Sequence, residues 1–140
     1  MAVEKIQLLL ARLYTDGNLR NHYAIEPNEV VSSFNLLQHC SELSTINLHQ
    51  LQKFSLSLIQ KRLKTIEEIL IDTFEALGKK KFGAFFLEYA YNQPLLRQEN
   101  AYIMDAIAFT DFLITSQNKL NLKKHIINVI KKERLYYLAN

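Results

Sequence analysis

The feature that most constrains the fold is an uninterrupted helical pattern in the middle of the chain. Residues 48–77 contain no glycine and no proline, and apolar side chains such as Leu51 and Leu58 recur there at the spacing of one helix face. Gly78 follows directly, and glycine is common just past the end of a helix. The pattern predicts one long helix over residues 48–77, with at most a bend near Asp72.

The rest of the chain repeats the helical pattern in shorter segments. Apolar spacing predicts helices near residues 2–14 and 99–115 and in the C-terminal segment. Thr15 or Asp16 is a candidate cap for a second helix, and Glu26 and Pro27 start a third. No stretch alternates with the period of a β-strand. We predict an all-α fold, a compact bundle of about five to seven helices with one long central helix and a basic C-terminal helix.

Charge is distributed unevenly along the chain. The formal net charge is +3, but residues 118–140 carry six basic side chains against the single acid Glu133. We therefore divide the chain into a helical domain of residues 1–117 and a basic C-terminal helix of residues 118–140 that packs on this domain or extends from it. The candidate contact residues of this helix are Lys123, Lys124, Lys131, Lys132 and Arg134.

The basic helix has several interpretations. The simplest is the solvated face of an amphipathic helix. It can also contact nucleic acid phosphates, an anionic lipid surface or an acidic partner, or form a homodimer. Dedicated nucleic-acid-binding proteins usually carry a stronger basic excess, so nucleic acid is the alternative and not the first interpretation.

Composition and the N-terminal residues indicate a cytoplasmic globular protein. The chain has 140 residues, of which 49% are hydrophobic and 22% charged, values typical of a folded domain. A single cysteine excludes a disulfide framework within the chain. No apolar run is long enough to span a bilayer, and the first residues offer no clean signal-peptide cleavage site.

Motifs for catalysis are scarce. His39 and Cys40 are adjacent, but neighbouring side chains on a helix point about 100° apart, and Cys40 lies in an apolar context that favours a buried thiol. Three glycines cannot form a glycine-rich phosphate loop. The histidines show none of the spacings of a helical metal site: they are His22, His39, His49 and His125. We predict no enzyme activity, no metal and no cofactor.

Aromatic residues are concentrated in two segments. Five lie within residues 82–91 and three within residues 102–112. The structural interpretation is a core between two helices. The functional interpretation is a groove for a protein or peptide, lined by tyrosines such as Tyr89 and Tyr102.

Several short strings resemble a poorly characterised bacterial helical domain. The first is ARLYTD at residues 11–16, and the others are residues 19–20, 55–58, 61–63, 77–78, 85–86, 89–90 and 105–109. The resemblance covers roughly residues 8–115 and leaves out the basic segment. Domains of that family are often fused behind, or encoded near, multinuclear non-haem iron oxidative enzymes that modify ribosomally made peptides. Where the family tends to have proline near Asp72, this chain has none, which predicts a straighter long helix.

The resemblance implies an accessory module and supplies no catalytic or metal-binding residue. Our hypothesis is a non-catalytic accessory protein that binds a peptide-modifying enzyme, its precursor peptide, or both. The alternative is a small nucleic-acid-binding regulator that uses the basic C-terminal helix. Polar residues in or near the matching strings form structural ion pairs, the interpretation we favour for the arginines, or contact the partner. The candidate partner-binding residues are Arg12, Asp16, Arg20, Arg62, Tyr89 and Tyr102.

Overall fold

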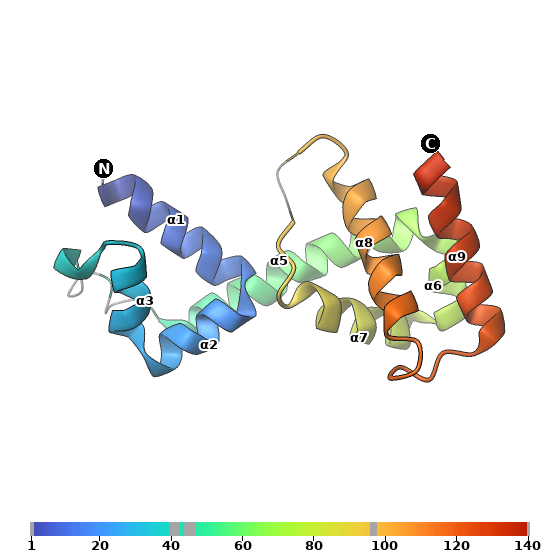
Figure 1. Ribbon diagram of the computed structural model, residues 1–140, viewed down its shortest axis with the longest axis horizontal. Coiled ribbons are helices and arrows are strands. Elements are labelled where there is room, and N and C mark those ends of the chain that lie inside the picture. The colour runs from blue at the N-terminus through green and yellow to red at the C-terminus, as the bar shows by residue number, and fades with distance from the viewer. Residues whose placement is uncertain (1, 40–42, 44–46, 96–97, 140) are drawn as a thin grey trace. The chain divides into compact units, whose positions relative to one another are not determined.

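The computed structural model describes residues 2–39, 43, 47–95 and 98–139. Secondary structure in this part of the chain is helical, which confirms the all-α prediction (Figure 1). These residues form eight α-helices and one short 3-10 helix, more than the five to seven expected. The elements are α1 (Ala2–Thr15), α2 (Gly17–Ile25), α3 (Pro27–Ser33), η1 (Leu37–His39), α5 (Leu48–Ile69), α6 (Ile71–Leu77), α7 (Lys79–Ala90), α8 (Ala101–Thr115) and α9 (Lys124–Ala139).

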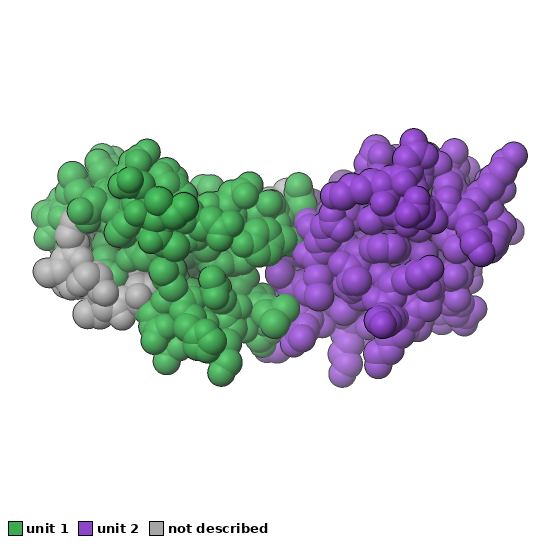
Figure 2. Space-filling view, turned by 90° about the horizontal axis from the view of Figure 1, so that it is seen from below, with its two compact units in different colours: residues 1–58, 91–94 green, residues 59–90, 95–140 purple. Residues whose placement is uncertain are grey.

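The helices form two compact units. Unit 1 comprises residues 1–58 and 91–94, and unit 2 comprises residues 59–90 and 95–140 (green and purple in Figure 2). This partition differs from the division at residues 117 and 118, which followed the charge. Within unit 2, α9 packs on α6 and α8. Compact units form where apolar helix faces pack together, and the apolar face of α9 packs against other helices of unit 2.

Unit 1 is built around the apolar faces of its first helices. Leu9 and Leu13 of α1 are fully buried, and Val30 of α3 is almost so. Tyr23 of α2 is buried beside them, and its hydroxyl donates a hydrogen bond of 3.0 Å to the main-chain carbonyl of Leu43. This bond satisfies the polar tip of a tyrosine whose ring contributes to the core.

The start of α2 is capped by its neighbour Asp16 and by a segment distant in sequence. The carboxylate of Asp16 accepts a bond of 3.0 Å from the main-chain N–H three residues further on, which confirms the predicted cap. The N–H of Gly17 donates to the carbonyl of Tyr91 at 3.0 Å, and that of Asn18 donates to the side chain of Asn92 at 2.9 Å. Tyr91 and Asn92 thus supply partners for N–H groups that a helix start leaves free.

The core of unit 2 is aromatic. Phe82 and Phe86 of α7 and Phe109 of α8 are fully buried. The ring of Phe109 lies edge-on to the other two, at centroid distances of 5.3 Å and 5.1 Å. Ile66 of α5 and Ile130 of α9 belong to the same cluster. The structural interpretation of the aromatic segments is therefore confirmed, and edge-to-face packing is the arrangement that such rings prefer.

The prediction of one continuous helix over residues 48–77 is wrong. The helix breaks at Leu70, so α5 ends at Ile69 and α6 begins at Ile71. We also expected a straighter helix because this chain lacks a proline near Asp72, and this expectation is wrong for the same reason. Gly78 does end the pattern as predicted, with a φ of 86° that favours glycine.

Contacts from α9 explain the break. The carboxylate of Glu133 accepts hydrogen bonds from the N–H groups of Asp72 and Thr73, both at 2.9 Å. On the other side of the break, the hydroxyl of Tyr137 donates to the carbonyl of Ile69 at 2.6 Å. Main-chain groups freed by the interruption are thus bonded by side chains of another helix, and no proline is needed.

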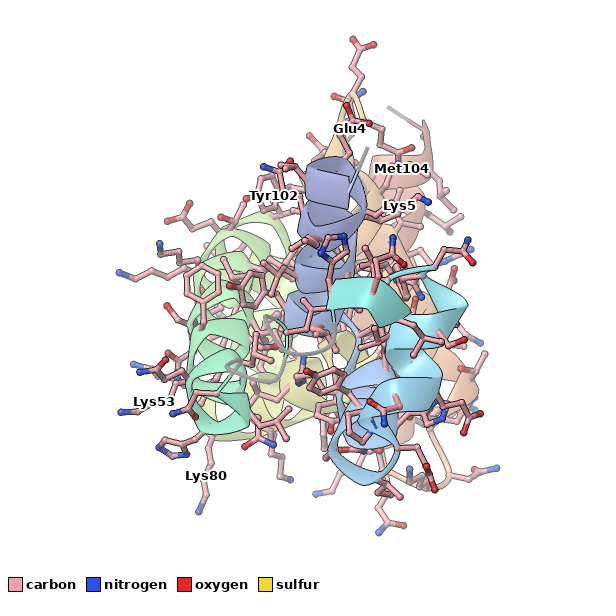
Figure 3. All side chains as sticks on the ribbon, turned by 90° about the vertical axis from the view of Figure 1, so that its left-hand side faces the viewer. Glu4, Lys5, Lys53, Lys80, Tyr102 and Met104 are labelled. Atoms are coloured by element: carbon pink, nitrogen blue, oxygen red, sulfur yellow. The ribbon has the colours of Figure 1, made fainter. Side chains whose placement is uncertain are left out.

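The three lysines after Gly78 belong to a helix. Helix α7 begins at Lys79, so Lys79, Lys80 and Lys81 make up its first turn. The side chain of Lys80 extends away from the ribbon into solvent (Figure 3). Positive charge at a helix start is unfavourable for the helix dipole, so packing of the aromatic face of α7 and not its charge holds this end.

Two glycine substitutions test the packing at the start of α2. A Cβ atom at Gly17 would lie 2.0 Å from the ring of Tyr91, whereas one at Gly83 in α7 would meet only the Leu63 side chain, at 3.8 Å. We expect Gly17→Ala to lower the free energy of unfolding by about 1–3 kcal/mol, through overpacking. Gly83→Ala, the control, should raise it by about 0.5–1 kcal/mol. Urea unfolding measures both, and equal effects of the two substitutions would contradict the close contact.

Candidate functional site

A buried network of polar side chains lies in unit 2. Arg62 of α5 donates from Nε and Nη2 to the two carboxylate oxygens of Asp105 in α8, at 3.1 Å and 2.8 Å. The hydroxyl of Tyr89 in α7 donates to the same carboxylate at 2.7 Å. All three residues are buried. The two-pronged pairing is the strongest geometry available to arginine and a carboxylate.

This network joins three helices and is closed to solvent. The Arg62 guanidinium also lies over the ring of Phe86, 5.5 Å from its centroid. The predicted ion pair of Arg62 is confirmed. Because Arg62 and Tyr89 are inside unit 2, these two candidate partner-binding residues offer no surface to a partner and hold α5, α7 and α8 together.

The surroundings of two tyrosines keep their hydroxyls protonated. Burial, followed by the hydrogen bond to Asp105, raises the pKa of Tyr89 well above its usual range. Burial, and then the nearby charge of Glu133, also raises the pKa of Tyr137. Both hydroxyls therefore act as neutral donors, to the carboxylate of Asp105 and to the carbonyl of Ile69.

In unit 1, Arg20 is buried but pairs with main-chain groups. Its Nη1 donates to the carbonyls of Leu13 and Tyr14 at 2.9 Å and 3.1 Å, at the end of α1. The guanidinium also lies 5.3 Å from the ring centroid of Tyr91. A cation at the carbonyl end of a helix interacts favourably with its dipole, so Arg20 stabilises the end of α1.

The other two candidates in unit 1 form an exposed ion pair. Nη2 of Arg12 lies 3.4 Å from the carboxylate of Asp16, four residues further on, which confirms the ion-pair interpretation for Arg12. A pair of this kind contributes about 0.3–0.5 kcal/mol. Asp16 is mainly the cap of α2, while about half of the Arg12 side chain stays exposed.

The exposed candidates of unit 2 lie on α8, on α9 and at Lys123 directly before α9. Tyr102 is 42% exposed on α8, and Met104, two residues further on, points to a different side of this helix (Figure 3). Lys123, Lys124, Lys131 and Lys132 are exposed, while Arg134 bonds to Asp111 of α8. None of these four lysines forms an ion pair with a residue that the structure describes. We use the name outward face of α9 for five exposed residues: Lys124, Lys131, Lys132, Leu135 and Leu138.

Two structural carboxylates were missed in the sequence, although each had a signal. Asp105 is an acid inside a strongly apolar helix, where an unpaired charge is costly. Glu133 is the single acid of a basic helix and follows the buried Ile130 by three residues, so it shares the buried face. A charged residue on an apolar helix face predicts a buried partner, although the sequence does not identify that partner.

Comparisons with protein-family models, curated proteins and solved structures found no match to this chain. Across the described residues, no three His, Cys, Asp or Glu side chains gather as a metal site would require. Cys40 lies outside these residues. None of the described helices has both the length and the apolar character needed to cross a membrane.

Removal of Asp105 tests the buried network. Asp105→Ala leaves the Arg62 charge buried without a partner, so we expect the free energy of unfolding to fall by about 3–5 kcal/mol. Replacing both charges, as in Arg62→Met with Asp105→Leu, should recover much of that loss. Glu88→Ala, which removes the exposed pair with Lys119, is the control and should cost at most about 1 kcal/mol. A double variant as unstable as the single one would contradict a coupled ion pair.

The raised pKa of Tyr89 predicts a loss of stability at alkaline pH. The unfolded chain ionises this tyrosine near its ordinary value of 10.0, while the folded chain keeps it protonated. Stability should therefore decrease as pH rises above 10, by about 1.4 kcal/mol at pH 11 from this residue. Tyr89→Phe should be less stable at neutral pH by about 1–3 kcal/mol, since a buried bond is lost, but should show a smaller alkaline decrease. Urea unfolding from pH 8 to 11 measures both effects, and parallel curves would rule out this role.

Proposed function

We propose that this chain is a non-catalytic accessory protein that binds a peptide-modifying enzyme, its precursor peptide, or both. The resemblance of roughly residues 8–115 to modules associated with multinuclear non-haem iron oxidative enzymes supports this proposal. Ribosomal peptides are made in the cytoplasm, so the proposal implies that the chain meets its partner there.

The observation that carries the proposal is an exposed apolar surface on α8 and α9. Met104, Leu135 and Leu138 are exposed by 50%, 62% and 50%. Neighbouring polar groups are bonded within the fold: Glu133 caps α6, and Arg134 pairs with Asp111. Exposed apolar side chains beside charged ones are a feature of protein-interaction surfaces.

Purification followed by reconstitution tests the accessory role. The tagged chain is isolated from its native host at low salt, with and without nuclease, and proteins and peptides that copurify in stoichiometric amounts are identified by mass spectrometry. An enzyme recovered in this way is then assayed on its full-length precursor with and without the chain. We expect the enzyme alone to lose solubility or turnover, and addition of the chain to restore it.

The control uses a chain with the exposed apolar residues replaced, Leu135→Ser with Leu138→Ser. These side chains are exposed, so the variant should fold normally and yet fail to restore the enzyme. Normal turnover of the precursor by the enzyme alone would contradict the accessory proposal.

The second candidate function is nucleic-acid binding through α9. The observation in its favour is that Lys123, Lys124, Lys131 and Lys132 are exposed and form no ion pair with any described residue. Four lysines of this kind can contact the phosphates of a duplex, which would make binding strongly dependent on salt.

This second candidate predicts a specific salt dependence. If the four lysines contact phosphates, affinity for a mixed-sequence duplex should fall about 10²-fold between 50 and 200 mM salt. Replacing all four by glutamine should abolish binding in an anisotropy titration. If the duplex does not bind the native chain even at low salt, the regulator interpretation is wrong.

A further inference from the structure

The outward face of α9 combines positive charge with apolar side chains along a single helix. Lys124, Lys131, Leu135 and Leu138 follow one another at spacings that return to the same side of a helix. Lys132 lies next to this line. The cationic residues therefore precede the apolar ones along one continuous surface.

None of the residues that the structure describes in unit 2 pairs with the positive charge of this surface. Glu133, the one acid of the segment, points inward and bonds the start of α6. Asp111, the acid of α8 that reaches α9, is paired with Arg134. Lys131 and Lys132 form no ion pair with any part of the chain that the structure describes. A complementary ligand for this surface carries negative charge.

The apolar part of the surface continues onto α8. The two helices pack against each other and run in opposite directions, so the start of α8 and the end of α9 lie at the same end of unit 2 (Figure 1). The bond between Arg134 and Asp111 fixes their register. Leu138 is one turn beyond Arg134, and Met104 is two turns before Asp111, so both lie toward that end.

We propose that the outward face of α9, together with Met104, binds an acidic amphipathic segment of a protein or peptide. The carboxylates of the segment face Lys124, Lys131 and Lys132, and its apolar side chains cover Leu135, Leu138 and Met104. This inference rests on the proposed accessory function and names the chemistry of the partner. Recognition through the apolar side chains of an amphipathic segment, spaced three or four residues apart, is a general mode of peptide binding.

Other ligands match only part of this surface. Nucleic acid would use the lysines, but its phosphates make no use of exposed leucines. A membrane-surface helix needs an apolar face along its whole length, and that of α9 is buried through Ile127 and Ile130. A second copy of the chain docking by the same face would bring no carboxylate to these lysines, because the face contains no acid. Only an acidic and apolar segment complements both halves.

A selection from random peptides tests this inference with the full chain. Peptides displayed on phage are selected on the purified protein at physiological salt, and the enriched sequences are compared with the starting library. We expect enrichment of Asp and Glu together with Leu, Ile or Phe at helical spacing. The strongest peptide is then synthesised and its affinity is measured by fluorescence anisotropy.

Matched charge variants locate the site. Lys124→Gln, Lys131→Gln and Lys132→Gln together should weaken binding of the selected peptide about 10- to 100-fold, since each exposed ion pair contributes a modest amount. Replacing Lys79, Lys80 and Lys81 by glutamine removes the same charge from exposed positions at the start of α7 and should have little effect. Lys80 and Met104, both in unit 2, lie far apart in the view of Figure 3.

Matched apolar variants test the other half of the surface. Leu135→Ser with Leu138→Ser should weaken binding about tenfold or more, because burial of two leucines is lost. Ile71→Ser removes another exposed apolar side chain of unit 2 and serves as the control.

Several results would overturn the inference. The first is that the selected peptides show no acidic excess, and the second is that the two lysine variants lose peptide affinity equally. The third is that no peptide is enriched. A DNA duplex or phosphatidylserine vesicles that bind through the same lysines, in the absence of peptide binding, would replace the proposed ligand. The selection needs no enzyme, so its failure with successful reconstitution would reject only this surface. Its success with failed reconstitution would reject only the accessory role.

Discussion

The position of α9 depends on one buried carboxylate, that of Glu133. Its two oxygens accept the first free N–H groups of α6, so the chain can turn at Leu70 without a local helix-breaking residue. A charged acceptor at a helix start also interacts favourably with the helix dipole. Glu133 points into unit 2. The adjacent exposed lysines therefore have no acid of their own helix beside them on the surface. The interaction that breaks one helix therefore also gives another its charged surface.

The second constraint is the ion pair between Arg62 and Asp105, which is surrounded by aromatic rings. An apolar core packs in many similar ways, whereas a two-pronged pair with a third donor from Tyr89 is satisfied in one arrangement of α5, α7 and α8. This arrangement sets the face that α8 turns toward α9. Polar residues within the strings that resemble accessory modules thus contribute to the surface indirectly, by fixing the helices that carry it.

Local signals predicted most of the helices, and distant contacts account for what was missed. Asp16 caps α2, Pro27 begins α3 and Gly78 follows the end of α6, all as the sequence indicated. The break at Leu70 was not predictable in this way because its cause lies on another helix. For the candidate site, exposure of the α9 lysines followed from helical spacing. The burial of Arg62 and Tyr89 did not, since it depends on Asp105.

The contacts of residues 91–94 affect the order in which the hydrogen bonds of unit 1 form during synthesis. Unit 1 uses the carbonyl of Tyr91 and the side chain of Asn92 at the start of α2, although its other residues end at 58. On the ribosome, the partners of Gly17 and Asn18 emerge only after α5, α6 and α7 have been made. Unit 1 therefore begins to form first, but the hydrogen bonds of Gly17 and Asn18 form only after residues 91 and 92 have been synthesised.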